Sequence, residues 1–153
     1  MPDVSDNAPD FTLPRDGGNT VTLSALNSGA VVLFFYPRDD TSGCTKEAVA
    51  FSGLKAEFDA AGATVMGISK DSVASHEKFR NKHALDVPLL SDEASETCEA
   101  YGVWKEKNMY GKKFFGIERS TFLIAPDGRI AKVWRKVKVP GHAEEVLDAV
   151  KAL

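Results

Sequence analysis

Short apolar runs alternate with amphipathic stretches along the first half of the chain. The apolar runs at 31–36 and 63–69 predict two central strands, because strands covered on both faces lose the alternation of polar and apolar side chains. Residues 43–61 and 72–82 carry apolar side chains at helical spacing, which predicts a helix after each strand. Gly62 is expected to end the first of these helices.

The second half of the chain begins with the same alternation and then changes to a hairpin pattern. Pro126-Asp127-Gly128 is a strong turn signal between two apolar runs. The predicted elements are a strand at 87–90, a helix at 92–101, an exposed loop at 105–118, a hairpin of strands at 120–125 and 129–134, and a closing helix at 143–153. Such an order indicates an α/β fold. We interpret it as one thioredoxin-like domain of residues 1–153, with a mixed central sheet and helices on both faces.

Composition narrows the classes of function. The 153 residues include 43% hydrophobic and 27% charged residues, as expected for a globular domain. A net charge of -3 argues against nucleic acid or an anionic membrane surface as a general partner. No apolar run approaches the roughly 20 residues that span a bilayer. The first residues lack the profile of a secretory signal, and two cysteines make no disulfide framework, so we expect a cytoplasmic protein.

The chemistry of the chain is concentrated where the first buried strand ends. Pro37 stops the strand because proline cannot donate a backbone hydrogen bond, and a polar loop follows. Cys44 then lies in the first turn of the predicted helix 43–61. Unpaired N–H groups and the positive end of the helix dipole favour an anion at this position. For a cysteine the relevant anion is its own thiolate.

The string Pro37-x-x-x-Thr41-x-x-Cys44 resembles the active-site signature of the peroxiredoxins. A second match follows far along the chain, at 109–112 and 116–124. Together the two matches resemble the peroxiredoxin Q subfamily, also called bacterioferritin comigratory protein, over nearly the whole chain. The resemblance implies a thioredoxin-like fold and a thiol-dependent peroxidase that reduces hydrogen peroxide and organic hydroperoxides through Cys44. It implies no metal, haem or flavin cofactor.

Ionisation of the cysteine does not by itself make a peroxidase. Lowering a thiol pKa from about 8.5 to about 6 raises the thiolate fraction at pH 7 roughly 30-fold, but lower nucleophilicity removes roughly 10-fold of that gain. Donors aimed at the developing charge must supply the rest. By resemblance, Thr41 contacts the peroxide, Arg119 holds the thiolate and the transition state, and Pro37 shields the sulfur from water.

Two further residues are assigned supporting roles. Glu47 is expected to orient Arg119, and the backbone N–H of Gly43 to add to the anion site. Asp39 and Asp40 are interpreted as solvated loop carboxylates. The three histidines of the chain, at 76, 83 and 142, are interpreted as solvated residues without metal-ligand spacing.

After attack on the peroxide, Cys44 is a sulfenic acid that a second thiol must reduce. Many peroxiredoxin Q proteins carry a resolving cysteine five residues after the first, where this chain has Val49, or in the following helix, where it has none. The remaining cysteine is Cys98, whose alternatives are a buried free thiol, a resolving cysteine reached by local unfolding, or a link to another chain. We favour a one-cysteine mechanism in a monomer, with thioredoxin or glutathione and glutaredoxin as the reductant.

Two other functions fit the same fold. A thiol–disulfide oxidoreductase would normally carry a C-x-x-C pair, but Glu47 and Thr41 occupy the positions where a partner of Cys44 would lie. A redox-sensing module would oxidise Cys44 once without turnover.

Overall fold

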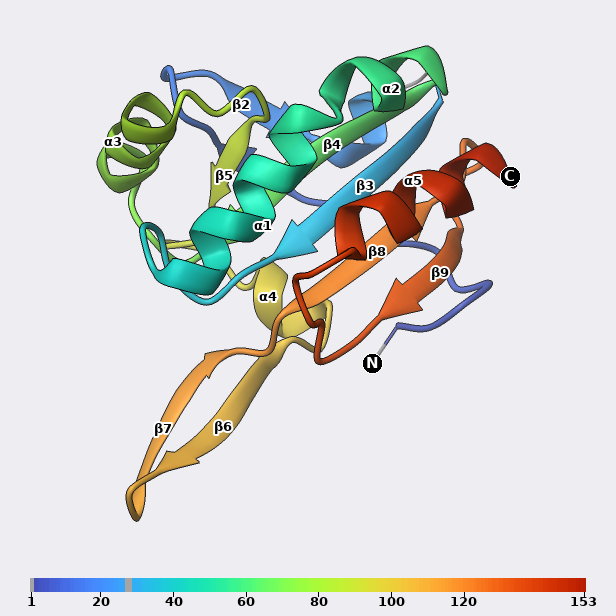
Figure 1. Cartoon of the computed structure of the whole chain (residues 1–153). Coiled ribbons are helices and arrows are strands. Elements are labelled where there is room, and N and C mark those ends of the chain that lie inside the picture. The colour runs from blue at the N-terminus through green and yellow to red at the C-terminus, as the bar shows by residue number, and fades with distance from the viewer. Residues whose placement is uncertain (1, 27–28) are drawn as a thin grey trace.

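The computed structural model describes residues 2–26 and 29–153 (Figure 1). The elements are, in chain order, β1 (Thr12–Pro14), β2 (Thr20–Thr22), the short 3₁₀ helix η1 (Leu23–Ala25), β3 (Ala30–Phe35), α1 (Ser42–Gly53), α2 (Lys55–Ala60), β4 (Ala63–Ser69), α3 (Val73–His83), β5 (Leu89–Ser91), α4 (Thr97–Ala100), β6 (Trp104–Met109), β7 (Lys112–Ile117), β8 (Ser120–Ile124), β9 (Ile130–Trp134) and α5 (His142–Lys151). Within these residues, no helix combines the length and the apolar character needed to cross a membrane.

The central sheet has five strands in the order β5-β4-β3-β8-β9. Strand β3 lies in the middle, and all six of its residues are buried. It pairs in parallel with β4 and antiparallel with β8, so the sheet is mixed. In the antiparallel ladder Phe35 lies opposite Ser120. The register therefore carries Arg119, which precedes Ser120, to the end of β3 where the polar loop begins.

Helices cover both faces of this sheet, which confirms the predicted fold class (Figure 1). Alternate β3 side chains such as Val32 and Phe34 pack with α1, α2, α3 and α5, whereas Val31, Leu33 and Phe35 pack with α4 and β1 on the opposite face. This alternation follows from the two-residue period of a strand. The sheet thus separates two apolar cores.

The prediction of an exposed loop at 105–118 is wrong. Strands β6 and β7 pair antiparallel across this region and form an arm that projects from the body of the molecule (Figure 1). Tyr110 and Gly111 form the turn with φ angles of 53° and 77°, which suits the tight turns that join hairpin strands. Most side chains on both faces of the arm are exposed, so no polar–apolar alternation marks these strands in the sequence.

Two predicted helices are shorter than expected. The predicted helix 43–61 is two helices, because Leu54 leaves the helical region with φ −102° and ψ 7° between α1 and α2. The predicted helix 92–101 is reduced to α4, since residues 92–96 form a turn instead. The hairpin of β8 and β9 is confirmed. Helix α3 begins after Ser72, whose hydroxyl accepts a 3.1 Å hydrogen bond from the Ser75 amide.

Candidate active site

Cys44 lies in the first turn of α1, with 1% of its surface exposed. It is a free thiol. The first helical hydrogen bond of this turn runs from the Thr45 amide to the Thr41 carbonyl at 2.8 Å. The amides of residues 42–44 therefore have no acceptor within the helix, as at any helix N-terminus. Cys44 consequently lies in the turn with free backbone donors, at the positive end of the helix dipole.

Arg119 reaches this sulfur from the β7–β8 connection. Its Nη2 donates to Cys44 Sγ at 3.3 Å, and its Nη1 donates to Glu47 Oε1 at 2.7 Å. Glu47 lies one helical turn after Cys44, so a single guanidinium bridges two side chains of α1. The planar fork of arginine suits this double contact better than the single ammonium of lysine would. The structure thus brings together three residues that the sequence singled out.

Glu47 is the most unusual of these groups electrostatically. Only 1% of its surface is exposed, and burial raises the pKa of its carboxyl to about 7, although the nearby Arg119 charge opposes this rise. Its second oxygen, Oε2, is buried and has no hydrogen-bond partner among the described residues. For Arg119, burial is outweighed by the charges of Glu47 and Cys44, so its pKa lies above the usual arginine value. The arginine remains a cation next to the sulfur.

Gly43 provides the space for this arginine. A Cβ atom at residue 43 would lie 3.1 Å from Arg119 Nη2, closer than ordinary van der Waals contact. The glycine is therefore needed for the close approach of the guanidinium to α1 and not for a special backbone angle.

Pro37 and Thr41 lie in the loop between β3 and α1. Pro37 is half-buried, whereas Thr41 is exposed at the start of the helix. The Thr41 hydroxyl donates to the Arg38 carbonyl at 2.9 Å. Since its hydrogen is used there, the lone pairs of the hydroxyl oxygen remain available to accept a hydrogen bond from a ligand.

Two interpretations of polar residues are wrong. Asp39 is buried rather than solvated, and the histidines at 76 and 142 are buried with 0% and 6% of their surfaces exposed. Each has polar partners inside the fold, which is the usual condition for burying such groups. Asp40 is exposed, as interpreted, and pairs with Lys82 and His83.

Lys107 is a further neighbour of the site that the sequence did not reveal. It extends from β6, and its Nζ donates to the Ile117 carbonyl at 2.6 Å, two residues before Arg119. Partial burial and the charge of Arg119 lower the pKa of Lys107, while the charges of Cys44 and Glu118 oppose this change. The base of the projecting arm therefore adds a second cation to the surroundings of the sulfur.

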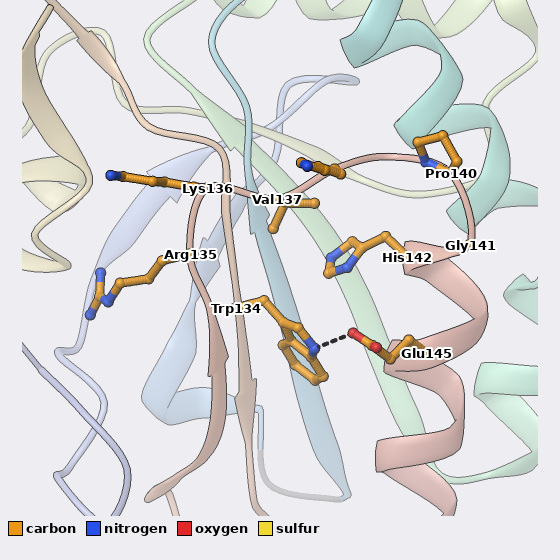
Figure 2. Close-up of a pocket in the computed structure, with 9 residues that line it drawn as sticks. Trp134, Arg135, Lys136, Val137, Pro140, Gly141, His142 and Glu145 are labelled. Atoms are coloured by element: carbon orange, nitrogen blue, oxygen red, sulfur yellow. Dashed lines mark hydrogen bonds between the residues drawn. The ribbon is translucent and has the colours of Figure 1, made fainter.

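A pocket of about 350 Å³ lies between β9, α5 and the segment that joins them (Figure 2). His142 lines it; its Nε2 is 2.8 Å from Thr121 Oγ1, and burial lowers the pKa of the ring to about 4. Trp134 donates to Glu145 at 2.7 Å across the pocket. Its lining contains neither Cys44 nor Arg119, so the pocket is separate from the reactive sulfur.

Cys98 lies on the opposite face of the sheet from Cys44. It belongs to the apolar core with α4 and β1, and none of its surface is exposed. Burial raises the pKa of its thiol, and the Asp92 carboxylate raises it further. The thiol is therefore held protonated and away from the Cys44 sulfur.

Known proteins resemble this chain over nearly all of its length. The model of the AhpC/TSA family matches residues 4–133. A protein described as putative peroxiredoxin bcp from Coxiella burnetii is 51% identical over 145 residues, covering 95% of this chain and 96% of its own. Peroxiredoxin Bcp from Bacillus subtilis is 46% identical and covers 97% of this chain and 95% of its own.

Solved structures give the same result. Peroxiredoxin Q from Xanthomonas campestris superposes with a TM-score of 0.89 at 51% identity, covering 93% of this chain and 90% of its own. A mutant of Xylella fastidiosa PrxQ superposes with a TM-score of 0.94 at 44% identity, covering 99% and 97%. A structural study of the Xanthomonas campestris bacterioferritin comigratory protein, 50% identical with a TM-score of 0.88 and coverage of 93% and 90%, concerns the alkyl peroxide reduction activity of that protein.

Proposed function

Because this chain belongs to the AhpC/TSA family and is a peroxiredoxin, we propose that Cys44 is its peroxidatic cysteine and Arg119 the cation that activates it. The protein is a thiol-dependent peroxidase, which acts on hydroperoxides and is reduced by thiols. The observation that carries the assignment is the 3.3 Å contact between Arg119 Nη2 and Cys44 Sγ. We propose hydrogen peroxide and alkyl hydroperoxides as substrates, in line with the activity studied in the Xanthomonas campestris relative.

The reaction begins with the Cys44 thiolate, which attacks the hydroxyl oxygen of the hydroperoxide. A sulfur–oxygen bond forms, the O–O bond breaks, and an alkoxide or hydroxide leaves and takes a proton from water. Cys44 is oxidised to a sulfenic acid, and the peroxide is reduced to an alcohol or water. Negative charge moves from sulfur to the leaving oxygen, so the guanidinium of Arg119 beside both atoms stabilises the transition state.

The remaining predicted residues fit supporting roles around this step. Glu47 holds Arg119 through Nη1 and leaves Nη2 directed at the sulfur. Gly43 allows the close approach, and its amide lies in the turn that has no helical acceptor. Thr41 accepts a hydrogen bond from the hydroperoxide, and the half-buried Pro37 limits access of water to the sulfur.

We propose that an external thiol reduces the sulfenic acid. It attacks Cys44 and releases water as a mixed disulfide forms; a second thiol then frees Cys44. Cys98 is badly placed for this task, since it lies across the sheet and its thiol is held protonated. A resolving role for Cys98 would require local unfolding. We further propose a monomer of one domain in the cytoplasm, with thioredoxin or glutathione and glutaredoxin as the reductant.

The test is peroxide consumption by the wild type, Cys44→Ser and Cys98→Ser, each with thioredoxin and with glutathione as reductant. We expect Cys44→Ser to lose turnover and Cys98→Ser to keep it, because Arg119 donates directly to the Cys44 sulfur, whereas burial and Asp92 raise the pKa of the Cys98 thiol. Sustained turnover by Cys44→Ser would refute the assignment of the peroxidatic cysteine. Loss of turnover in a folded Cys98→Ser would refute the one-cysteine mechanism.

A further inference from the structure

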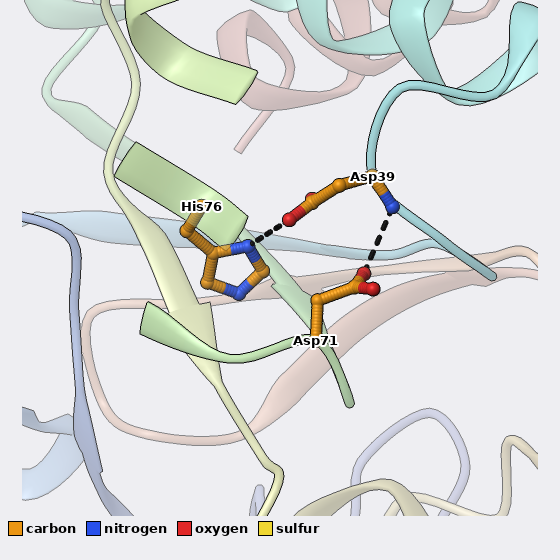
Figure 3. Close-up of side chains that lie close together, drawn as sticks. All are labelled: Asp39, Asp71 and His76. Carbon is orange, nitrogen blue, oxygen red and sulfur yellow. Dashed lines mark hydrogen bonds and ion pairs between the residues drawn. The ribbon is translucent and has the colours of Figure 1, made fainter. Parts of the chain in front are cut away.

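A buried polar network fixes the middle of the loop between β3 and α1. The Asp39 carboxylate accepts hydrogen bonds from the Tyr36 hydroxyl at 2.6 Å and the Ser75 hydroxyl at 2.8 Å. It also accepts one from His76 Nδ1 at 2.7 Å (Figure 3). The Asp39 amide donates to Asp71 Oδ2 at 2.8 Å. The Asp39 side chain is thus bonded to the start of α3, and its backbone amide is bonded to the segment that follows β4.

His76 joins this loop to a second strand. Its Nδ1 faces Asp39, and its Nε2 lies 2.9 Å from the Leu90 carbonyl of β5. Both ring nitrogens of His76 face oxygen atoms, so the ring connects Asp39 on one side with β5 on the other. Removing either partner of the Asp39–His76 pair would leave a buried polar group without its hydrogen bond, which is costly.

The network is a closed set of hydrogen bonds rather than an ion site. Asp39, Asp71 and His76 lie close enough to share a metal ion, with their ligand atoms within 4.8 Å of one another. However, Asp39 and His76 are bonded to each other, and Asp71 Oδ2 also accepts from the Ser69 hydroxyl at 2.6 Å. A metal would have to displace these contacts, so the geometry favours a structural connection.

We propose that the Asp39–His76 pair positions the peroxide-binding loop, and that it does so through Thr41 and Pro37, which each lie two residues from Asp39. The inference rests on the proposed function of Cys44. Thr41 is bonded within its own loop to the Arg38 carbonyl, so its hydroxyl moves with the backbone that Asp39 anchors. Cys44 is instead fixed by α1 and Arg119. Loosening the pair therefore affects peroxide activation more than it affects the thiolate.

The neighbouring residue supplies a matched control. Asp40 accepts from Lys82 Nζ at 2.7 Å and from His83 Nε2 at 2.8 Å, at the other end of α3. Asp40 is exposed and His83 is half-buried, so these contacts compete with water and are weak. His83 lies on α3, like His76, and bonds a carboxylate of the β3–α1 loop, like His76. The variant His83→Gln is therefore a matched control that leaves the buried pair in place.

The experiment compares two reactions of Cys44 in the whole chain. One is the second-order rate of oxidation by hydrogen peroxide, measured by stopped flow; the other is the rate of alkylation by iodoacetamide, which reports the thiolate but needs no peroxide activation. For His76→Gln we expect peroxide oxidation to fall roughly 10- to 100-fold, because a small displacement of a positioning group costs about this much. Alkylation should stay within about threefold of the wild type, and His83→Gln should change neither rate by more than about twofold.

The outcomes separate this inference from the proposed function. Peroxide oxidation within about twofold of the wild type in His76→Gln would overturn the positioning role while leaving Cys44 as the peroxidatic residue. Equal losses in both reactions would also overturn it, since the thiolate itself would then be affected. If His76→Gln does not fold, Asp39→Asn weakens the pair from its other side, because an amide replaces the carboxylate that accepts from His76. In that variant, peroxide oxidation should fall by about threefold while alkylation stays at the wild-type rate. Equal losses relative to the wild type in the two reactions, or no loss in either, would refute the proposal.

Discussion

Cys44 and Cys98 are buried to the same extent, with 1% and 0% of their surfaces exposed, but the charged groups that act on them most directly differ in sign. Cys44 has a guanidinium at 3.3 Å and lies in the first turn of α1. Cys98 has the Asp92 carboxylate as its strongest charged neighbour, and its thiol pKa is raised by burial and by that charge. Equal burial therefore does not give the two thiols the same environment, because the charged groups that share the buried space differ.

The topology of the sheet explains how these surroundings arise. The β3–β8 register carries Arg119 to the end of β3, beside the first turn of α1. Asp92 lies near Cys98 for a different reason: its carboxylate accepts from the Thr97 and Cys98 amides at 3.0 and 2.7 Å and satisfies the start of α4. The carboxylate that adds to the effect of burial on the Cys98 pKa thus also satisfies the first amides of α4.

Arg119→Met removes the feature that distinguishes Cys44 and has the largest expected effect. Peroxide oxidation of Cys44 should slow roughly 100- to 1000-fold, the usual loss for a donor aimed at developing charge. Arg119→Lys should lie between this variant and the wild type, because a point charge replaces a fixed fork. Stopped-flow kinetics measures both. Arg135→Met is the control, since Arg135 bonds the Pro2 carbonyl instead; a loss there as large as that in Arg119→Met would contradict the account.

Glu47 should make the stability of the wild type depend on pH. Its pKa is raised from about 4.5 to about 7, so between these values the folded state binds more protons than the unfolded state. The free energy of unfolding should therefore fall as pH rises through this window. Relative to Glu47→Gln, the loss should be on the order of 2–3 kcal/mol. Urea unfolding at several pH values measures this loss. If the free energy of unfolding depends on pH in the same way in the two proteins, the pKa of Glu47 is not raised in the folded state.

Gly43→Ala should disturb the site without removing any polar group. The new methyl would lie 3.1 Å from Arg119 Nη2 and displace the guanidinium, so we expect peroxide oxidation to slow about 10-fold. Gly53→Ala is matched to it, being in the same helix with no atom within 4 Å of the added Cβ. That variant should retain full activity and gain up to about 1 kcal/mol of stability. Equal activity of the two variants would contradict the packing argument.

Cys98→Ala should have the smallest effect. The thiol acts as a small apolar group in its core, so truncation should cost about 1 kcal/mol of unfolding free energy and leave peroxide turnover within about twofold. Chemical denaturation and a steady-state peroxidase assay measure the two quantities. A large loss of turnover in the folded variant would mean that Cys98 takes part in the cycle.

The elements that form the central sheet were predictable because their patterns are strong. Unbroken apolar runs mark β3 and β4, and a Pro-Asp-Gly turn marks the β8–β9 hairpin. The β6–β7 arm was missed because its strands are exposed on both faces, which removes the alternation on which strand prediction depends. The break at Leu54 was missed because the residues around it continue a helical pattern.

The candidate site was likewise predicted in part and missed in part. Cys44 could be placed at a helix start from local pattern, and the family resemblance pointed to Arg119, but the contact between them depends on strand register. Asp39 and His76 were missed because a buried charged residue looks like a solvated one in a single sequence. The one available signal was the Ser72 N-cap, which places residues 75 and 76 in the first turn of α3, directly after a buried strand. Their partners across the fold are set by tertiary packing.

Under the proposed mechanism, the Cys44 sulfur reacts with peroxide and the Cys98 sulfur does not. The most direct test is to treat the reduced protein with one equivalent of hydrogen peroxide, quench within milliseconds, trap sulfenic acid and free thiols with different reagents, and map both cysteines by peptide mass spectrometry. The account predicts sulfenic acid at Cys44 and a free thiol at Cys98. Sulfenic acid at Cys98, or a Cys44–Cys98 disulfide that forms as fast as peroxide is consumed, would contradict it.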